Sequence, residues 1–290
     1  MTGRSIAALV LLLSFLISPS AIAEVNVEPG VYKKTTQRWK AAISLSSFNS
    51  DSWLWKLGIH DRKHENNSRD SILLIPKNAL PDDITLVIWF HGCSGFSQKT
   101  FNNRIIGQFT SIIENNHSVA IAVPEMPWSI NTSTTCGRQG RVWRSNFSLQ
   151  KYVDNLHVRL SRWASSEHEV PLGTVRTVVI GHSAGGSAIM SASLEGSLCS
   201  IKPEAVVWSD ATYGRWLQRA WSGCMSGLGF DLHVVVRKWD KPHYNTRKFM
   251  RNIQRNERSI FYKVLDRKRW KHGGIGDNII NLTNIFPPGC

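Results

Sequence analysis

From Ile84 onward, short apolar runs alternate with segments whose apolar residues recur at helical spacing. The runs have the length of strands and cover 84–90, 118–123, 174–180, 205–208, 232–236 and 260–265. The helix-like stretches between several of them cover 101–113, 149–163, 184–195, 244–256 and 277–284. Strands that are apolar on both faces and alternate with amphipathic helices form a mostly parallel sheet with helices on both sides. The sequence therefore predicts an α/β fold.

In such a sheet, ligands bind at the carboxyl ends of the strands, so the residues that follow each strand are the first candidates for a site. The strand at 174–180 is followed by the glycine-rich sequence GHSAGG, which contains Gly181, Ser183 and Gly185 in a G-x-S-x-G pattern. Between a strand and a helix, this pattern makes a sharp turn that presents the serine above the sheet. We therefore interpret Ser183 as a nucleophile. The alternative is a glycine-rich turn whose serine merely caps the helix.

This turn resembles the nucleophile turn of the α/β-hydrolase family, and a second segment is similar to the oxyanion loop of that family. The second segment begins with His91, Gly92 and Cys93 and follows the strand at 84–90. The resemblance implies an α/β-hydrolase domain over 81–290, in which the backbone N–H groups of Ala184 and of Gly92 or Cys93 hold the oxyanion. The family often has a further glycine where this chain has Cys93. An ordinary tight turn is the alternative for this segment.

The family order of nucleophile, acid and histidine places the general base in the loop after the last strand, where His272 lies. His243 is the rival base, but no strand separates it from its candidate acid. Two carboxylates are candidates for the acid. Asp240 follows the penultimate strand, which is the usual family location, and is preferred; Asp210 follows the strand before it and is the second choice.

The first residues predict export. Arg4, an apolar run from Ile6 to Ile17 and the small residues up to Ala23 form a signal peptide, 1–23, which directs the mature chain to a secreted or periplasmic location. Residues 24–80 are expected to be an N-terminal extension that packs on the catalytic domain. No later run approaches the length of a membrane span.

Disulfide bonds are expected because the mature chain would reach an oxidising compartment. The pairs we expect are Cys199–Cys224 and Cys93–Cys136, although four paired cysteines admit three connectivities. Cys290 is then left over. No metal-binding motif is present, and no cofactor is expected.

Charge and aromatic content bear on the substrate. The chain has 35 Lys and Arg against 21 Asp and Glu, a net charge of +14, which favours an anionic polymer surface as a partner or reflects a solvated basic face. Six of the 12 Trp residues fall near strand ends and would line a cleft or fill the core: Trp89, Trp128, Trp143, Trp208, Trp239 and Trp270. The Ser-Ala-Gly-Gly run at 183–186 is similar to that of carbohydrate esterases of the pectin-acetylesterase kind.

These observations predict a serine hydrolase that cleaves an ester through an acyl-enzyme, without metal or cofactor. The candidate substrates are an acyl group on a glycan and an aryl or short-chain ester. A serine peptidase or amidase of the same fold is one alternative, and a catalytically silent secreted protein that binds anionic polymers is another. No nucleic-acid-binding motif accompanies the basic charge, so no nucleic-acid partner is expected.

Overall fold

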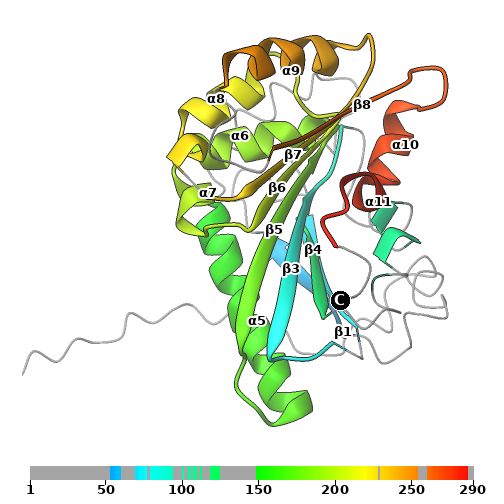
Figure 1. Cartoon of the computed structure of the whole chain (residues 1–290). Helices are drawn as coiled ribbons and strands as arrows, with labels where there is room; N and C mark the ends of the chain where they lie inside the picture. Colours follow the sequence, from blue (N-terminus) through cyan, green and yellow to red (C-terminus); the bar gives the residue numbers. More distant parts are fainter. Residues whose placement is uncertain are drawn as a thin grey trace, which may run out of the picture.

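In the part of the chain that the structure describes, eight strands form one sheet in the order β1-β2-β4-β3-β5-β6-β7-β8 (Figure 1). The computed structural model describes residues 53–59, 69–76, 79–93, 100, 104–105, 107–109, 112, 118–124, 148–227, 229–253 and 260–286. The expected signal peptide, Trp128, Trp143, Cys136 and Cys290 lie outside these ranges. The strands are β1 (Trp53–Ile59), β2 (Arg69–Ile75), β3 (Asp83–Phe90), β4 (Val119–Val123), β5 (Thr174–His182), β6 (Ala205–Ser209), β7 (Asp231–Arg237) and β8 (Ile260–Leu265).

The sheet is mostly parallel. All neighbouring pairs from β4 through β3 and β5 to β8 are parallel, whereas β2 is antiparallel to both β1 and β4. The six strands expected from the apolar runs are all present. The stretch 24–80 also contributes β1 and β2 to the same sheet, and the sequence analysis did not predict these two strands.

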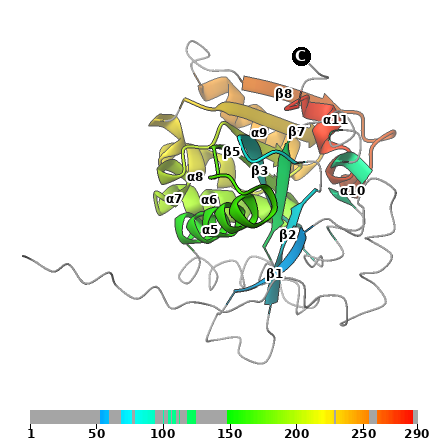
Figure 2. The ribbon, with the colours of Figure 1, turned by 90° about the horizontal axis from the view of Figure 1, so that it is seen from below.

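Helices cover both faces of this sheet (Figures 1 and 2). They are α5 (Leu149–His168), the 3₁₀ turn η5 (Ser183–Gly185), α6 (Gly186–Leu194), α7 (Ser197–Ser200), α8 (Trp216–Ser222), the 3₁₀ turn η6 (Met225–Gly227), α9 (Lys241–Asn252), α10 (His272–Gly276) and α11 (Ile279–Thr283). Successive residues of a strand point to opposite faces, so Leu86 and Ile88 of β3 lie in one hydrophobic cluster and Val87 and Trp89 in the other. The observed architecture is the predicted α/β arrangement.

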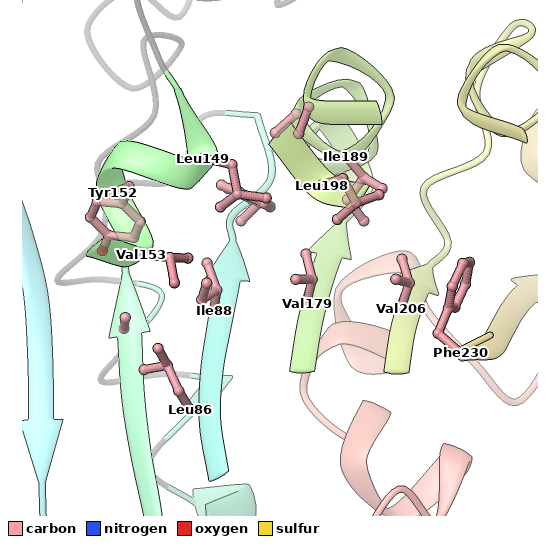
Figure 3. Packing of buried hydrophobic residues seen from close by; sticks show 14 of the residues in the cluster. Leu86, Ile88, Leu149, Tyr152, Val153, Val179, Ile189, Leu198, Val206 and Phe230 are labelled. Carbon is pink, nitrogen blue, oxygen red and sulfur yellow. The ribbon is translucent and has the colours of Figure 1, made fainter. Parts of the chain in front are cut away.

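The larger cluster lies under α5 to α9. Ser148 caps α5 by accepting a hydrogen bond from the Lys151 N–H, and the buried stripe of this helix then packs on β3 and its neighbours. Figure 3 shows Leu149 and Val153 of α5 above Leu86 and Ile88 of β3. The smaller cluster receives helical residues at 105, 109 and 112 together with α10 and α11.

The boundaries of two helices differ from expectation. The helix expected over 244–256 is α9, which begins at Lys241 because Pro242 suits the first turn of a helix, where its missing N–H costs nothing. The helix expected over 277–284 is the shorter α11, which ends at Asn284 in the left-handed conformation. Within the described residues, no helix is both long enough and apolar enough to cross a membrane.

The disulfide between Cys199 and Cys224 is present, with 5.9 Å between the two Cα atoms. It links α7 to the segment before η6, and it confirms one of the two expected pairs. Cys93 is also disulfide-bonded, and its expected partner Cys136 lies outside the described residues.

Candidate active site

Ser183 lies at the sharp turn between β5 and α6, as the glycine pattern predicts. Its φ of +54° is in the left-handed region, which a residue other than glycine adopts only when the surrounding structure holds it there. His182 before it is extended, and the 3₁₀ turn η5 begins at Ser183 and leads directly into α6. The side chain is only partly buried. The turn therefore presents the hydroxyl at the carboxyl edge of the sheet, beside a helix N-terminus that favours developing negative charge.

Close packing explains the glycine after the serine. A Cβ built on Gly185 would overlap the carbonyl oxygen of Phe90 and lie 2.8 Å from the carbonyl carbon. Phe90 is the last residue of β3, so α6 starts directly against the end of the neighbouring strand. The tight turn thus depends on a residue without a side chain at 185.

The segment after β3 lies against Ser183. A Cβ on Gly92 would be 3.0 Å from the Ser183 Cβ, so the Gly92 backbone is in contact with the serine side chain. His91 is buried, and its Nδ1–H donates to the Gly92 carbonyl at 2.9 Å. Ala184 belongs to the first turn of the helical run, where backbone N–H groups have no acceptor within the helix. The structure thus brings Ala184, Gly92 and Ser183 together at one point.

His272 begins α10 after the last strand, and its Nδ1 lies 2.6 Å from Oδ2 of Asp210. The Asp210 carboxylate is fully buried, whereas the His272 side chain is one-third exposed. The second carboxylate oxygen accepts the backbone N–H of Arg237 at 3.2 Å. A histidine whose Nδ1–H donates to a carboxylate keeps the Nε2 lone pair available to accept a proton.

Two neighbours place His272 beside Ser183. The ring of His182, the residue before the serine, stacks on His272 with 4.9 Å between centroids. The ring of Tyr213 packs edge-on against His272 at 6.4 Å, and Ser183 is among the groups close enough to act on the pKa of Tyr213. Burial and the Asp210 charge raise the pKa of Tyr213, so this hydroxyl stays protonated.

Asp240, which was the preferred candidate for the acid, does not pair with His272. It forms an ion pair with Arg237 and a longer one, of 3.9 Å, with Arg267. The reason is the strand order. Asp210 follows β6, which pairs directly with β5 and its Ser183 turn, whereas Asp240 follows β7, one strand further away. The pairing of His272 with Asp210 corrects the preference for Asp240. His243, the rival base, accepts the Trp239 N–H at 3.4 Å.

Two polar side chains hold the segment that carries His272, and sequence reasoning missed both. Arg104 donates from Nη1 to the Gly273 carbonyl at 2.6 Å and to Oδ1 of Asp277 at 2.8 Å. Gln108 donates to the Gly276 carbonyl at 2.8 Å and accepts the Ile280 N–H at 3.0 Å. Arg104 and Gln108 are four residues apart within an apolar stripe, so they lie on one face of a helix. Two polar side chains on an otherwise apolar helical face are the sequence feature that could have marked them as buried hydrogen-bonding residues.

His182 is fully buried beneath His272. Its Nδ1 lies 3.0 Å from the Ser209 carbonyl, an atom that can only accept, so Nδ1 carries the proton of a neutral ring. Burial lowers the pKa of His182 well below its ordinary value of 6.5, and the nearby charges of His272 and Arg104 lower it further. Sequence reasoning treated this residue only as part of the turn.

Because of His182, we expect the free energy of unfolding to decrease as the pH is lowered below about 6.5. In the unfolded chain the His182 ring is protonated below about pH 6.5, whereas in the folded protein it stays neutral to a lower pH. The contribution of the neutral ring to the free energy of unfolding is therefore complete above pH 6.5 and is lost as the pH falls toward the lower pKa of the folded state. One such proton contributes a slope of up to about 1.4 kcal/mol per pH unit. Urea unfolding between pH 7.5 and 5 should give a shallower slope for His182→Gln than for the wild type. Equal slopes would contradict the assignment.

The tryptophans near strand ends divide into two groups. Trp89 and Trp208 are fully buried and belong to the core, and Trp270 packs partly buried against the smaller cluster. Trp239 differs, because 54% of its surface is exposed. Among the described residues, no group of three His, Cys, Asp or Glu side chains could hold a metal ion.

A cavity of about 580 Å³ lies at the opposite end of the sheet. Its lining includes Arg176, Ala205 and Asp231, which lie at or near the starts of β5, β6 and β7. The residues around Ser183 lie at the ends of these strands, so this cavity is separate from the candidate active site.

Comparisons with known structures identify the fold. A ferulic acid esterase of the CE1 family from the anaerobic fungus Anaeromyces mucronatus aligns with a TM-score of 0.53 at 12% identity, over 81% of this chain and 90% of its own. An S-formylglutathione hydrolase from Agrobacterium tumefaciens aligns with a TM-score of 0.51 at 12% identity, over 80% and 93%. The chain has the α/β-hydrolase fold. No protein-family model matches the sequence, and no curated protein matches it either.

Proposed function

We propose that this protein is a serine hydrolase that cleaves a carboxylic ester, with Ser183 as nucleophile, His272 as general base and Asp210 as the acid. The observation that carries the proposal is the hydrogen bond from His272 to the buried Asp210, beside a serine held in a left-handed turn. An imidazole oriented by a carboxylate next to a partly buried serine at a helix N-terminus is the arrangement that activates a hydroxyl.

In the proposed reaction, His272 Nε2 takes the Ser183 proton as the oxygen attacks the ester carbonyl. The negative oxygen of the tetrahedral intermediate is stabilised by the N–H of Ala184 and an N–H of the Gly92 or Cys93 backbone. His272 then gives the proton to the leaving alcohol, and an acyl-enzyme remains. Water attacks this ester by the same route, releasing the acid and restoring Ser183. Asp210 stabilises the imidazolium without taking its proton.

The substrate class we favour is an ester of an acyl group on a glycan. We also propose that the protein is exported. The support is the basic surface, the Trp239 side chain exposed at the same edge of the sheet, and the fold shared with a ferulic acid esterase. A disulfide between Cys199 and Cys224 is consistent with an oxidising compartment. The same groups could cleave amides, so matched ester and amide substrates should be compared.

The proposal is tested with a fluorophosphonate probe, whose phosphorus is attacked by an activated serine with loss of fluoride. We expect one adduct per molecule of folded protein, and peptide mapping should place it on Ser183. Ser183→Ala should abolish labelling and His272→Ala should greatly slow it, whereas Ser200→Ala, which removes an exposed hydroxyl on α7, should label like the wild type. Absence of an adduct on folded protein would favour the catalytically silent, polymer-binding alternative.

A further inference from the structure

Trp239 combines two features that core packing does not explain. Its side chain is 54% exposed, and its φ of +67° is in the left-handed region, which is unfavourable for a bulky residue. Such a conformation costs free energy, and burial of the indole does not offset that cost here. The residue two positions earlier, Arg237, ends β7 and donates its N–H to Asp210. The exposed indole therefore lies at the edge of the sheet that carries the proposed catalytic residues.

The segment around Trp239 is tied to the loop that carries Asp210 and Tyr213. Thr212 in that loop donates to the Pro242 carbonyl at 2.9 Å, and its own carbonyl accepts from Asn245 at 2.8 Å. The charges of Asp240 and Arg237, on either side of Trp239, both act on the pKa of Tyr213, and so does Ser183. The segment that follows the indole is thus tied to the loop that carries Asp210 and Tyr213.

A second aromatic ring and a cation accompany the indole. Tyr244 is 52% exposed, and its ring centroid is 6.4 Å from that of Trp239. The Lys238 ammonium lies 5.0 Å from the centre of the Trp239 ring. Around them the chain is strongly basic, since residues 237–253 and 260–271 hold eleven Lys and Arg side chains against two Asp. Exposed ring faces beside ammonium and guanidinium groups favour a flat ring that carries a negative charge.

We propose that Trp239, Tyr244 and Lys238 form a subsite for a uronic-acid ring, so that the ester this protein cleaves is an acyl group on an acidic polysaccharide. The apolar face of the sugar ring packs on the indole, and the carboxylate pairs with Lys238 while the neighbouring acyl group reaches Ser183. This inference rests on the proposed function. It adds the substrate class and the residues that select it.

The experiment compares kcat/KM for acetylated oligomannuronate, an acetylated xylo-oligosaccharide of equal length, methyl ferulate and 4-nitrophenyl acetate. We expect the wild type to prefer the acidic oligomer among the two glycans. Trp239→Ala should lower the ratio of kcat/KM for that oligomer to kcat/KM for 4-nitrophenyl acetate about 10- to 100-fold, as the loss of a central aromatic contact does. Lys238→Gln should lower the preference for the acidic over the neutral oligomer, and added salt should weaken that preference.

The matched controls are Leu194→Ala, which truncates another exposed apolar side chain at the far end of α6, and Lys202→Gln, which removes an exposed cation before β6. Both should leave the ratios unchanged. The subsite is wrong if Trp239→Ala leaves the ratio as it is, if the neutral oligomer or methyl ferulate is preferred, or if the acidic oligomer is not cleaved. Failure of the wild type to cleave any of the four esters would instead refute the proposed function.

Discussion

Replacing Asp210 by Asn should lower kcat by about 10³- to 10⁴-fold, whatever the ester. The amide keeps the size of the side chain but removes the charge that stabilises the His272 imidazolium. It also offers an N–H₂ group toward Nδ1, which favours the wrong tautomer of the ring. Asp210 is fully buried, but the amide oxygen can still accept the Arg237 N–H, so the variant should retain its fold while losing turnover. The rate of 4-nitrophenolate release at saturating 4-nitrophenyl acetate measures kcat.

Asp240→Asn is the matched control, because the same change is made on a carboxylate that pairs with Arg237 and Arg267 instead of His272. It should retain kcat within about a factor of ten, the scale on which losing a partly exposed ion pair acts. Circular dichroism and thermal unfolding of both variants check that they fold. If Asp240→Asn were the inactive variant and Asp210→Asn the active one, the assignment of the acid would be reversed.

Gly185→Ala should destabilise the protein by about 3 kcal/mol, the upper part of the range for overpacking. By helix propensity alone the change should stabilise, because Gly185 has a helical φ of −57° and alanine is the better helix former by about 1 kcal/mol. The new Cβ would overlap the Phe90 carbonyl oxygen, and backbone cannot move aside as a flexible side chain can. The steric effect should therefore exceed the propensity effect. Urea unfolding measures the difference from the wild type.

Gly227→Ala serves as the control, because a Cβ there meets nothing within 4 Å. It ends the 3₁₀ turn η6 and should change the free energy of unfolding by less than about 1 kcal/mol. A Gly185→Ala variant as stable as the Gly227→Ala variant would show that β3 and α6 can separate at this point, and the close approach of the two would not be a requirement of the turn.

Much of the architecture could be predicted from local patterns. The run Val119–Val123 is apolar and buried throughout, and only a strand covered on both faces buries all of it. The two turns that follow β3 and β5 were also predicted, because glycines at fixed spacing permit sharp turns and close backbone contacts that other residues prevent. β1 and β2 were missed because their sequences, WLWKLGI and RDSILLI, lack continuous apolar character, and their place in the sheet depends on pairing with each other and with β4.

Contacts between distant parts of the chain could not be predicted in this way. Arg104 and Gln108 bond to residues about 170 positions later, and nothing in their own neighbourhood identifies those partners. The exposure of Trp239 likewise depends on how the chain turns after β7. Trp208, by contrast, lies within the apolar run of β6 and is fully buried.

The sequence by itself determined the parallel α/β arrangement and the position of Ser183, because hydrophobic periodicity and glycine spacing act through neighbouring residues. It also determined the short set of acid candidates, since each follows a strand. Only the tertiary structure shows that His272 pairs with Asp210 and that Asp240 pairs with Arg237. That difference depends on which strand lies next to β5 in the sheet and on where the loop after it ends, and both are set by packing between segments far apart in the chain.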